Sequence, residues 1–239
     1  MPNIITFDGT ASSDYNLIIM EAPTFERPTR KQSVFNVPGK NGAVIFQQNA
    51  WDNVARTYEV GLIERSGQTL TEAVDTFEAY LNSKTGYKRL EDSFEPDVFR
   101  LAYFSGGVSF TNDMMQAGKA SLPFICRPER FLTSAETPVT VTNGATINNP
   151  TLFTSKPLIH IEVSSQTTIT VSIGGNTISA EVFDYINIDC DTMSAYRLAS
   201  ENRNGSISGS FPIIPSGSQT VGITGTASLV TIVPRFFII

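Results

Sequence analysis

The sequence predicts a mainly β protein with two domains, of which only the first contains a helix. A single segment, residues 69–83, has the apolar spacing of an amphipathic helix. Short apolar runs separated by turn-forming residues fill the remainder of the chain. A polar stretch divides the 239 residues into two parts of ordinary domain size. We expect an N-terminal β-sandwich-like domain with one docked helix over 1–132, a linker over 133–138 and an all-β sandwich over 139–239.

The helix has start and stop signals as well as periodicity. Thr69 followed by Glu72 forms a capping box, in which each side chain accepts a hydrogen bond from a backbone N–H at the helix start. Gly86 lies just beyond the pattern and is expected to stop the helix. The apolar side chains recur at steps of four, three and four, which places them on one face: Leu70, Val74, Phe77 and Leu81. Such a helix cannot bury this face alone and needs a sheet to pack on.

The segments before the helix predict strands, an arm and a hairpin. The expected strands are 4–7, 16–20, 34–37, 43–46 and 57–62. In the last of these, Tyr58, Val60 and Leu62 alternate and therefore share one face. Ala22–Lys31 contains two prolines and four charges, and is either a solvated loop or a contact for a neighbouring subunit. Pro38–Gly42 joins its two flanking strands as a hairpin with a longer loop.

The segments after the helix predict strands only. Strands are expected at 98–104, 119–126, 159–163, 169–173, 177–182, 186–189, 221–223 and 229–233. Gly174, Gly175 and Asn176 predict a tight turn between two of them. About eight short strands in the last hundred residues are typical of a β-sandwich or jelly roll.

The charge balance excludes several classes of partner. The chain has 17 Lys+Arg and 23 Asp+Glu, a net charge of −6. The excess of acidic side chains is the same in both parts of the chain, because residues 1–130 contain 13 basic and 16 acidic side chains and the remaining residues contain 4 and 7. No domain is basic, which argues against sequence-specific nucleic-acid binding. No run of 18 apolar residues occurs, which excludes a membrane-spanning helix, and the start of the chain lacks the pattern of a secretory signal.

The single histidine and the two cysteines predict no reactive centre. His160 lies in mid-strand on the face opposite the isoleucines, and the chain contains no G-x-S-x-G motif to supply a partner nucleophile. Cys126 and Cys190 are far apart in sequence and are expected to be buried small hydrophobes rather than a disulfide or part of a zinc site. Gly39-Lys40 lacks the spacing of a phosphate-binding loop.

Carboxylate pairs give only weak signals of catalysis or metal binding. They lie beside turn-forming residues, where local hydrogen bonding and solubility explain them: Glu91 with Asp92, Glu95 with Asp97, and Asp189 with Asp191. A lone D-x-D lacks the spacing of a calcium loop. Asn204-Gly205-Ser206 fits a glycosylation pattern but is interpreted as a hairpin turn. We therefore expect no enzyme, no cofactor, and no catalytic, cofactor-binding or metal-binding residues.

The order and spacing of turn and strand signatures over nearly the whole chain resemble the distal tail protein family of long, non-contractile-tailed bacteriophages. In the first domain these signatures are Phe7-x-Gly9, Ser13-Asp14-Tyr15, Val37–Gly42, Trp51-x-Asn53, Thr57-Tyr58, Tyr80-Leu81, Gly86-Tyr87, Leu90–Asp92, Phe99-Arg100 with Ala102, and Phe124-x-Cys126-x-Pro128. In the second they are Asn143-Gly144, Asn149-Pro150, Ile188-Asp189 and Pro234.

This resemblance implies a structural virion protein that forms a homohexameric ring at the tail tip or baseplate. The ring would join the tail tube protein to the tail hub protein, near the tape-measure protein and around the channel through which DNA leaves. The C-terminal domain would be galectin-like and face receptor-binding or side-fibre proteins. We further expect the arm at Ala22–Lys31 and the hairpin at Pro38–Gly42 to contribute to subunit contacts. No membrane contact is expected, and the host cytoplasm is the expected site of assembly.

The alternative function is that of a carbohydrate-binding module acting in host-surface adhesion. Galectins stack a sugar on a tryptophan, and the only tryptophan here, Trp51, lies in the other domain. Tyr185 or Tyr196 offers a stacking face instead, although a packing role also explains each. A glycan-cleaving tail enzyme is a third possibility and would need an acid pair.

Overall fold

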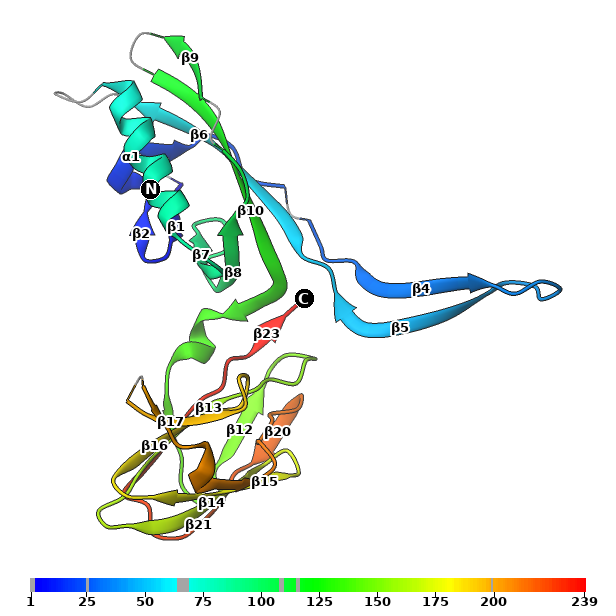
Figure 1. Cartoon of the computed structure of the whole chain (residues 1–239), viewed down its shortest axis with the longest axis vertical. Coiled ribbons are helices and arrows are strands. Elements are labelled where there is room, and N and C mark those ends of the chain that lie inside the picture. The colour runs from blue at the N-terminus through cyan, green and yellow to red at the C-terminus, as the bar shows by residue number, and fades with distance from the viewer. Residues whose placement is uncertain (1–2, 25, 64–68, 108–109, 115–116, 199) are drawn as a thin grey trace. The chain divides into compact units, whose positions relative to one another are not determined.

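The structure is a computed structural model that describes residues 3–24, 26–63, 69–107, 110–114, 117–198 and 200–239. The chain forms two compact units (Figure 1). The first unit comprises residues 1–130 with residue 239, and the second comprises residues 131–238. Among the described residues, no helix is both long and apolar enough to span a membrane.

The first unit is built on one large sheet. Its strands follow the order β2-β1-β7-β8-β10-β6-β3, and β9 also pairs with β10. Their bounds are β1 (Ile5–Phe7), β2 (Thr10–Ala11), β3 (Leu17–Ile19), β6 (Val54–Ile63), β7 (Lys88–Asp92), β8 (Val98–Phe104), β9 (Phe110–Met114) and β10 (Ala117–Leu132). A 3-10 turn, η1 (Ser12–Tyr15), separates β2 from β3. The pairing of β10 with β6 ends at Cys126 opposite Val54, so Pro128, which has no N–H to donate, lies beyond that ladder.

The predicted helix is confirmed as α1 (Leu70–Ser83), which begins with the predicted capping box. The N–H of Thr69 donates to Oε2 of Glu72 at 2.9 Å, and the N–H of Glu72 donates to Oγ1 of Thr69 at 3.3 Å. Phe77 and Leu81 are buried in the core, whereas the side chain of Leu70 lies outside the described part. Gly86 does not stop the helix as expected, because the chain is already extended at Lys84.

The core of the first unit lies between α1 and the sheet. Tyr58, Val60 and Leu62 are all buried, as their alternation predicted. Phe124 on β10 packs against Phe7 and Tyr58, with ring centroids 5.1 and 6.0 Å away. The helix face and the inward face of the sheet therefore close one apolar cluster.

The predicted hairpin is also confirmed, and it is longer than expected. It consists of β4 (Arg30–Asn36) and β5 (Ala43–Trp51), which pair only with each other among the described strands. The turn contains Gly39 and Gly42, both at φ +80°, a conformation that favours glycine. We call this two-stranded element the β4–β5 hairpin.

The second unit is a sandwich of two sheets. The six-stranded sheet has the order β11 (Val139–Thr140), β22 (Leu229–Val233), β13 (Leu158–Glu162), β16 (Tyr185–Asp189), β17 (Ser194–Arg197) and β18 (Glu201–Asn202). The four-stranded sheet has the order β19 (Ile207–Gly209), β15 (Asn176–Val182), β14 (Thr167–Ile173) and β21 (Gly222–Thr224). The short strands β12 (Thr146–Asn149) and β20 (Gly217–Thr220) pair with each other, and β23 (Phe237–Ile238) is the last strand.

Alternation along these strands closes the second core. Ile159 and Ile161 on one sheet and Ile169, Val171 and Ile173 on the other are at most 1% exposed and belong to one cluster. The turn at Gly174 and Gly175 joins β14 to β15 as predicted. The fold class predicted from the sequence, mainly β with one helix in the first part, is therefore confirmed.

The hairpin turn predicted at Asn204-Gly205-Ser206 is wrong. These residues form a 3-10 turn, η3 (Asn204–Ser206), between β18 and β19. The reason is a capping side chain: Oδ1 of Asn204 accepts the backbone N–H of Ala195 at 2.6 Å, while Oδ1 of Asn202 accepts the N–H of Asn204 at 2.8 Å. The chain is thereby drawn back onto β17 instead of reversing into a hairpin.

Candidate functional surfaces

Asp92 makes the expected local hydrogen bonds of a turn, but Asp92 and Glu95 are not solvated as expected and belong to a largely buried ion network. Nη2 of Arg56 donates to Oδ2 of Asp92 at 2.7 Å, and the Tyr58 hydroxyl donates to the same oxygen at 2.7 Å. The side chains of Arg56 and Asp92 are only 3% and 1% exposed. Asp92 also accepts the backbone N–H of Glu95 through Oδ1, at 3.0 Å. The Asp92 carboxylate therefore has two roles: it closes a turn, and it neutralises the buried Arg56.

Glu95 extends the network to two further arginines. Its carboxylate pairs with Arg100 on β8, with Arg130 on β10 at 3.0 Å, and with Arg56 at 3.4 Å. The other members of the predicted pairs lie apart, because Glu91 pairs with Arg89 at 2.6 Å and Asp97 is exposed.

The protonation states suit a structural network. Burial acts to raise the pKa of Asp92, but the Tyr58 hydrogen bond and the charges of Arg56 and Arg100 outweigh it and hold that pKa below its usual value. The same balance, with Arg100 as the main partner, lowers the pKa of Glu95. Burial raises the pKa of Tyr58 well above its usual value, so its hydroxyl stays protonated and donates. Neither carboxyl is poised to give up a proton near neutral pH.

The network fixes the point where the β4–β5 hairpin enters the sheet. β5 ends at Trp51, and Arg56 is the third residue of β6. Arg56 is held to β7 by Asp92, and Glu95 then links it to β8 and β10 through Arg100 and Arg130. The arrangement therefore anchors four strands beneath the root of the hairpin.

The carboxylates of the second unit do not form a metal site. Asp189 accepts two hydrogen bonds from Arg235, at 2.8 and 3.1 Å, while Asp191 pairs with Lys156 at 3.2 Å. Burial acts to raise the pKa of Asp189, but the Arg235 guanidinium outweighs it and lowers that pKa. In the part of the chain that the structure describes, no three His, Cys, Asp or Glu side chains gather to hold a metal ion.

The two cysteines are buried free thiols, one in each unit. Burial raises the pKa of Cys126 to about 11 and that of Cys190 to about 12. Because the thiolate is the reactive form, neither side chain is an activated nucleophile.

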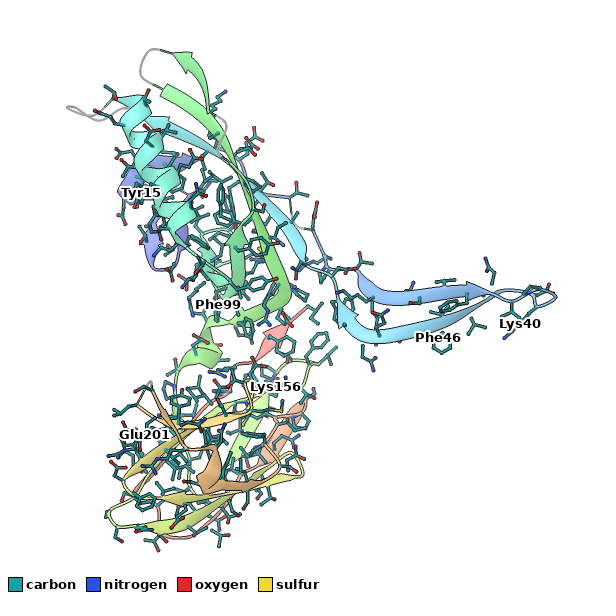
Figure 2. All side chains as sticks on the ribbon, viewed as in Figure 1. Tyr15, Lys40, Phe46, Phe99, Lys156 and Glu201 are labelled. Carbon is teal, nitrogen blue, oxygen red and sulfur yellow. The ribbon has the colours of Figure 1, made fainter. Side chains whose placement is uncertain are left out.

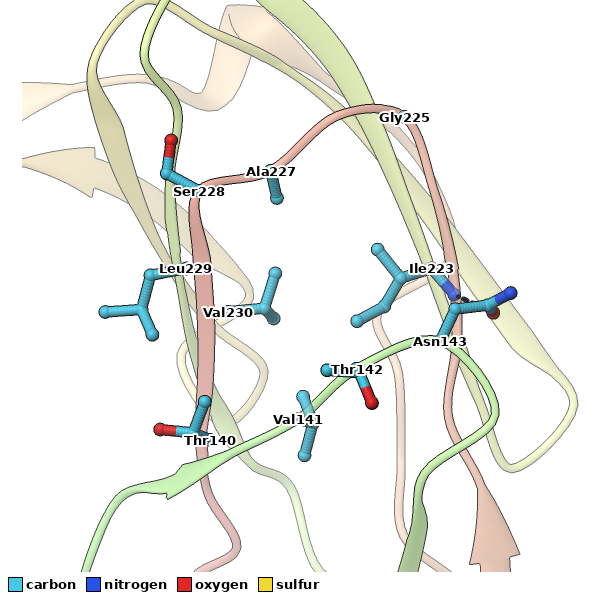
Figure 3. Close-up of a pocket in the computed structure, with 10 residues that line it drawn as sticks. All are labelled: Thr140, Val141, Thr142, Asn143, Ile223, Gly225, Ala227, Ser228, Leu229 and Val230. Atoms are coloured by element: carbon cyan, nitrogen blue, oxygen red, sulfur yellow. Dashed lines mark hydrogen bonds between the residues drawn. The ribbon is translucent and has the colours of Figure 1, made fainter.

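An open pocket of about 280 Å³ lies in the second unit, between the segment that follows β11 and the β21–β22 connection (Figure 3). Its walls are mainly apolar, with Val141, Ile223 and Val230 facing one another. The side-chain oxygen of Asn143 is already occupied, since Oδ1 accepts the backbone N–H of Ile223 at 2.9 Å. The pocket therefore offers little polar chemistry to orient a ligand.

The β4–β5 hairpin exposes apolar side chains on both faces. Phe35 lies opposite Val44, and Phe46 follows on the same face of the neighbouring strand, with the two phenylalanine rings 5.7 Å apart. Val34 lies opposite Ile45, so this pair points to the other face. Figure 2 shows Phe46 along the hairpin and Lys40 at its tip.

The exposure of these side chains is large for residues of their type. Phe35 and Phe46 are 55% and 60% exposed on one face, and Val34 and Ile45 are 55% and 56% exposed on the other. A two-stranded hairpin without further packing is marginally stable in water. Exposed apolar surface of this kind marks an interaction site, and here it lies on both faces of the β4–β5 hairpin.

The predicted arm, Ala22–Lys31, leads directly into the hairpin. Its last two residues already belong to β4, and Phe25 lies outside the described residues. The Arg30 guanidinium lies over the Trp51 ring, 5.7 Å from its centroid, and Lys31 pairs with Asp52 at 3.6 Å. These contacts tie the end of the arm to the root of the hairpin.

Comparison with known proteins gives a family match for the first part of the chain. Residues 13–126 match the family model of the phage tail protein RIFT-related domain. This range includes α1, the ion network up to Arg100, and the whole β4–β5 hairpin. A comparison with curated proteins found no match.

Solved structures of phage proteins share the fold. The crystal structure of the SPP1 Dit protein, described as a paradigm of the hub adsorption apparatus in phages infecting Gram-positive bacteria, matches with a TM-score of 0.73 over 100% of both chains at 14% identity. A chain of the phage p2 baseplate in its activated conformation with Sr matches with a TM-score of 0.54 over 97% of each chain at 13% identity. At these identities the likeness shows the fold alone.

Proposed function

We infer that this chain, which carries the phage tail protein RIFT-related domain and has the fold of SPP1 Dit, is a structural component of a phage tail or baseplate. The sequence resemblance to the distal tail protein family leads to the same function. The similar proteins are tail and baseplate components, which supports a role that is structural rather than enzymatic.

The more specific proposal is a homohexameric ring at the distal end of a long, non-contractile tail. In the virion, the ring joins the tail tube protein to the tail hub protein, next to the tape-measure protein, and DNA only passes through its lumen. Receptor-binding or side-fibre proteins attach to the second unit. The chain is made and assembled in the host cytoplasm.

The observation that carries this proposal is the β4–β5 hairpin. A ring needs a heterologous interface, in which a surface of one copy meets a different surface of the next. The hairpin supplies such a projecting element, and it has apolar side chains on both faces, with Phe35 on one and Ile45 on the other. A neighbouring copy that covers these faces removes exposed apolar surface from water. The arm joins this contact because it leads into β4.

The test is the solution mass of the purified full chain, measured by light scattering over a concentration series. We expect the wild-type chain to form a species near six subunits. A double variant, Phe35→Asp with Ile45→Asp, places one charge on each face of the hairpin, and we expect it to remain monomeric because charges are strongly disfavoured in an apolar contact.

Asn36→Asp is the matched control, since it adds a negative charge at an exposed position of the same strand and removes no apolar side chain. We expect this variant to assemble like the wild type. The proposal is wrong if the double variant forms the ring normally, or if the wild-type chain stays monomeric both alone and with the tube protein.

A further inference from the structure

A polar row crosses the outward face of the six-stranded sheet of the second unit. Strand register places one residue from each strand directly opposite the next, in the order Thr140, Thr231, His160, Asn187, Tyr196 and Asn202. We call this set the transverse row. Neighbouring strands lie about 4.8 Å apart, so the row extends roughly 24 Å. All six side chains are exposed or half-buried, whereas in the central strands β22, β13, β16 and β17 the neighbouring residues Ile232, Ile159, Ile188 and Ala195 belong to the core.

The centre of the row is held in a defined geometry. Nδ1 of His160 lies 2.8 Å from Oδ1 of Asn187, and Nε2 lies 2.9 Å from Oε1 of Glu162. The Tyr185 ring packs 5.7 Å from the imidazole, and the Arg197 guanidinium lies 5.4 Å from the centroid of Tyr185. The imidazole is thus fixed from two sides, and it orients the amide of Asn187.

Several polar groups of the row remain available to a ligand. Among the described residues, the amide nitrogen of Asn187 and the hydroxyls of Tyr196 and Thr231 have no hydrogen-bond partner. The Tyr196 ring is half-buried and has no aromatic or cationic partner among these residues. An ordered amide, two hydroxyls and a half-buried aromatic ring along one line form a binding surface for a polar ligand with apolar patches.

The charge pattern selects the ligand class. The charged side chains at the row already have partners within the protein: Glu162 lies against His160, Arg197 pairs with Asp184, and Asp189 pairs with Arg235. A charged ligand would therefore have to compete with these internal partners for an opposite charge. A neutral saccharide matches it, because its hydroxyls both donate and accept hydrogen bonds and its C–H faces stack on aromatic rings.

We propose that the transverse row binds a neutral oligosaccharide. Tyr196 stacks on a pyranose ring, while Asn187 and Thr231, which both lie on the same side of Tyr196 along the row, bond the hydroxyls of the following units. This site differs from one built around a tryptophan, since Trp51 belongs to the first unit. The activity adds to the structural role.

The experiment uses the labelled full chain on an array of neutral oligosaccharides of glucose, galactose, N-acetylglucosamine and rhamnose. The saccharides that bind are then titrated in solution by calorimetry. We expect at least one to bind, and we expect Tyr196→Ala and Asn187→Ala each to weaken it roughly tenfold or more, since each removes a stacking or hydrogen-bonding partner. Thr168→Ala is the matched control, because Thr168 is exposed on the other sheet.

Thermal unfolding and light scattering of each variant separate loss of the site from loss of the fold or of the ring. We expect both to match the wild type for Tyr196→Ala. The proposal is overturned if no neutral oligosaccharide binds, if binding requires a charged saccharide and disappears at high salt, or if folded Tyr196→Ala and Asn187→Ala bind as tightly as Thr168→Ala.

Discussion

The β4–β5 hairpin and the six-stranded sheet of the second unit use the same strand pattern in opposite ways. In the sheet, Ile188 is 0% exposed and its neighbour Asn187 belongs to the polar outward row. In the hairpin, Ile45 is 56% exposed and its neighbour Phe46 on the other face is 60% exposed. The sheet has one face buried by its own unit and one face suited to water. The hairpin has two faces suited to burial, and within the described part of its unit β4 and β5 pair only with each other.

This contrast separates a binding surface from an assembly surface. A polar face remains stable without a ligand, so a chain can present it to solvent and bind reversibly. A ribbon that is apolar on both faces gains stability only when another protein covers it. The hairpin therefore predicts a lasting contact, and the sheet face predicts an exchangeable one.

The largest expected effect concerns the network that anchors the hairpin root. Replacing Asp92 with Ala leaves Arg56 and Arg100 without their buried partner, and we expect a loss of about 3–5 kcal/mol in the free energy of unfolding of the first unit. Chemical denaturation followed by the fluorescence of Trp51, the only tryptophan, reports this unit selectively. Asp97→Ala is the control, because this nearby carboxylate is exposed, and its effect should stay within about 0.5 kcal/mol.

If Asp92→Ala unfolds like the wild type, the network does not hold the hairpin root. The hairpin would then lack the anchor at β6 that holds its apolar faces in a fixed position for a partner.

A smaller effect compares one residue type in the two regions. Ile188→Val removes a buried methylene, and we expect it to cost about 0.5–1.5 kcal/mol of stability in the second unit. Ile45→Val removes the same group from an exposed side chain, and we expect less than about 0.5 kcal/mol in the isolated chain. Differential scanning calorimetry of the two variants measures both changes.

The comparison becomes sharper when the calorimetry is repeated on the assembled protein. In the assembled protein we expect Ile45→Val to lower the stability more than it does in the isolated chain. The loss of stability caused by Ile188→Val should be the same in both forms. Equal costs for Ile45→Val in both forms would mean that no partner covers this face of the hairpin.

Patterns along one segment predicted the fold well, while pairings between segments stayed hidden. The four-residue spacing of Phe77 and Leu81 predicted α1, and the alternation of Ile159 and Ile161 predicted the inward face of β13. Both predictions were possible because each pattern repeats within a few residues. The family resemblance is likewise confirmed by the domain match over residues 13–126. The predicted end of α1 at Ser83 is also confirmed, although the chain leaves the helix at Lys84 rather than through the expected stop at Gly86.

The ion network and the transverse row depend on information that one segment does not contain. Arg56 lies two residues before Tyr58 and so shares its inward face, which was a visible signal of a buried charge needing a partner. Its partner Asp92 lies 36 residues away on β7, and nothing in either segment specifies that pairing. The row follows from the register of six strands, which a shift of one residue in any strand would destroy.

The smallest expected effect is the response of assembly to pH. The hairpin, residues 30–51, contains no Asp, Glu or His, so its own charge does not change between pH 8 and pH 5. We expect the mass measured by light scattering to remain constant over this range, because the apolar contact that we propose does not titrate.

Acid acts instead on the network beneath the hairpin. The pKa values of Asp92 and Glu95 are lowered in the folded protein. Their contribution to stability is fully present above the unfolded pKa of about 4, and it is lost as the pH falls through the folded values. Trp51 fluorescence should therefore report destabilisation of the first unit only below about pH 4. A ring that dissociates between pH 8 and pH 5 would show that titrating side chains, rather than the apolar faces of the hairpin, hold the copies together.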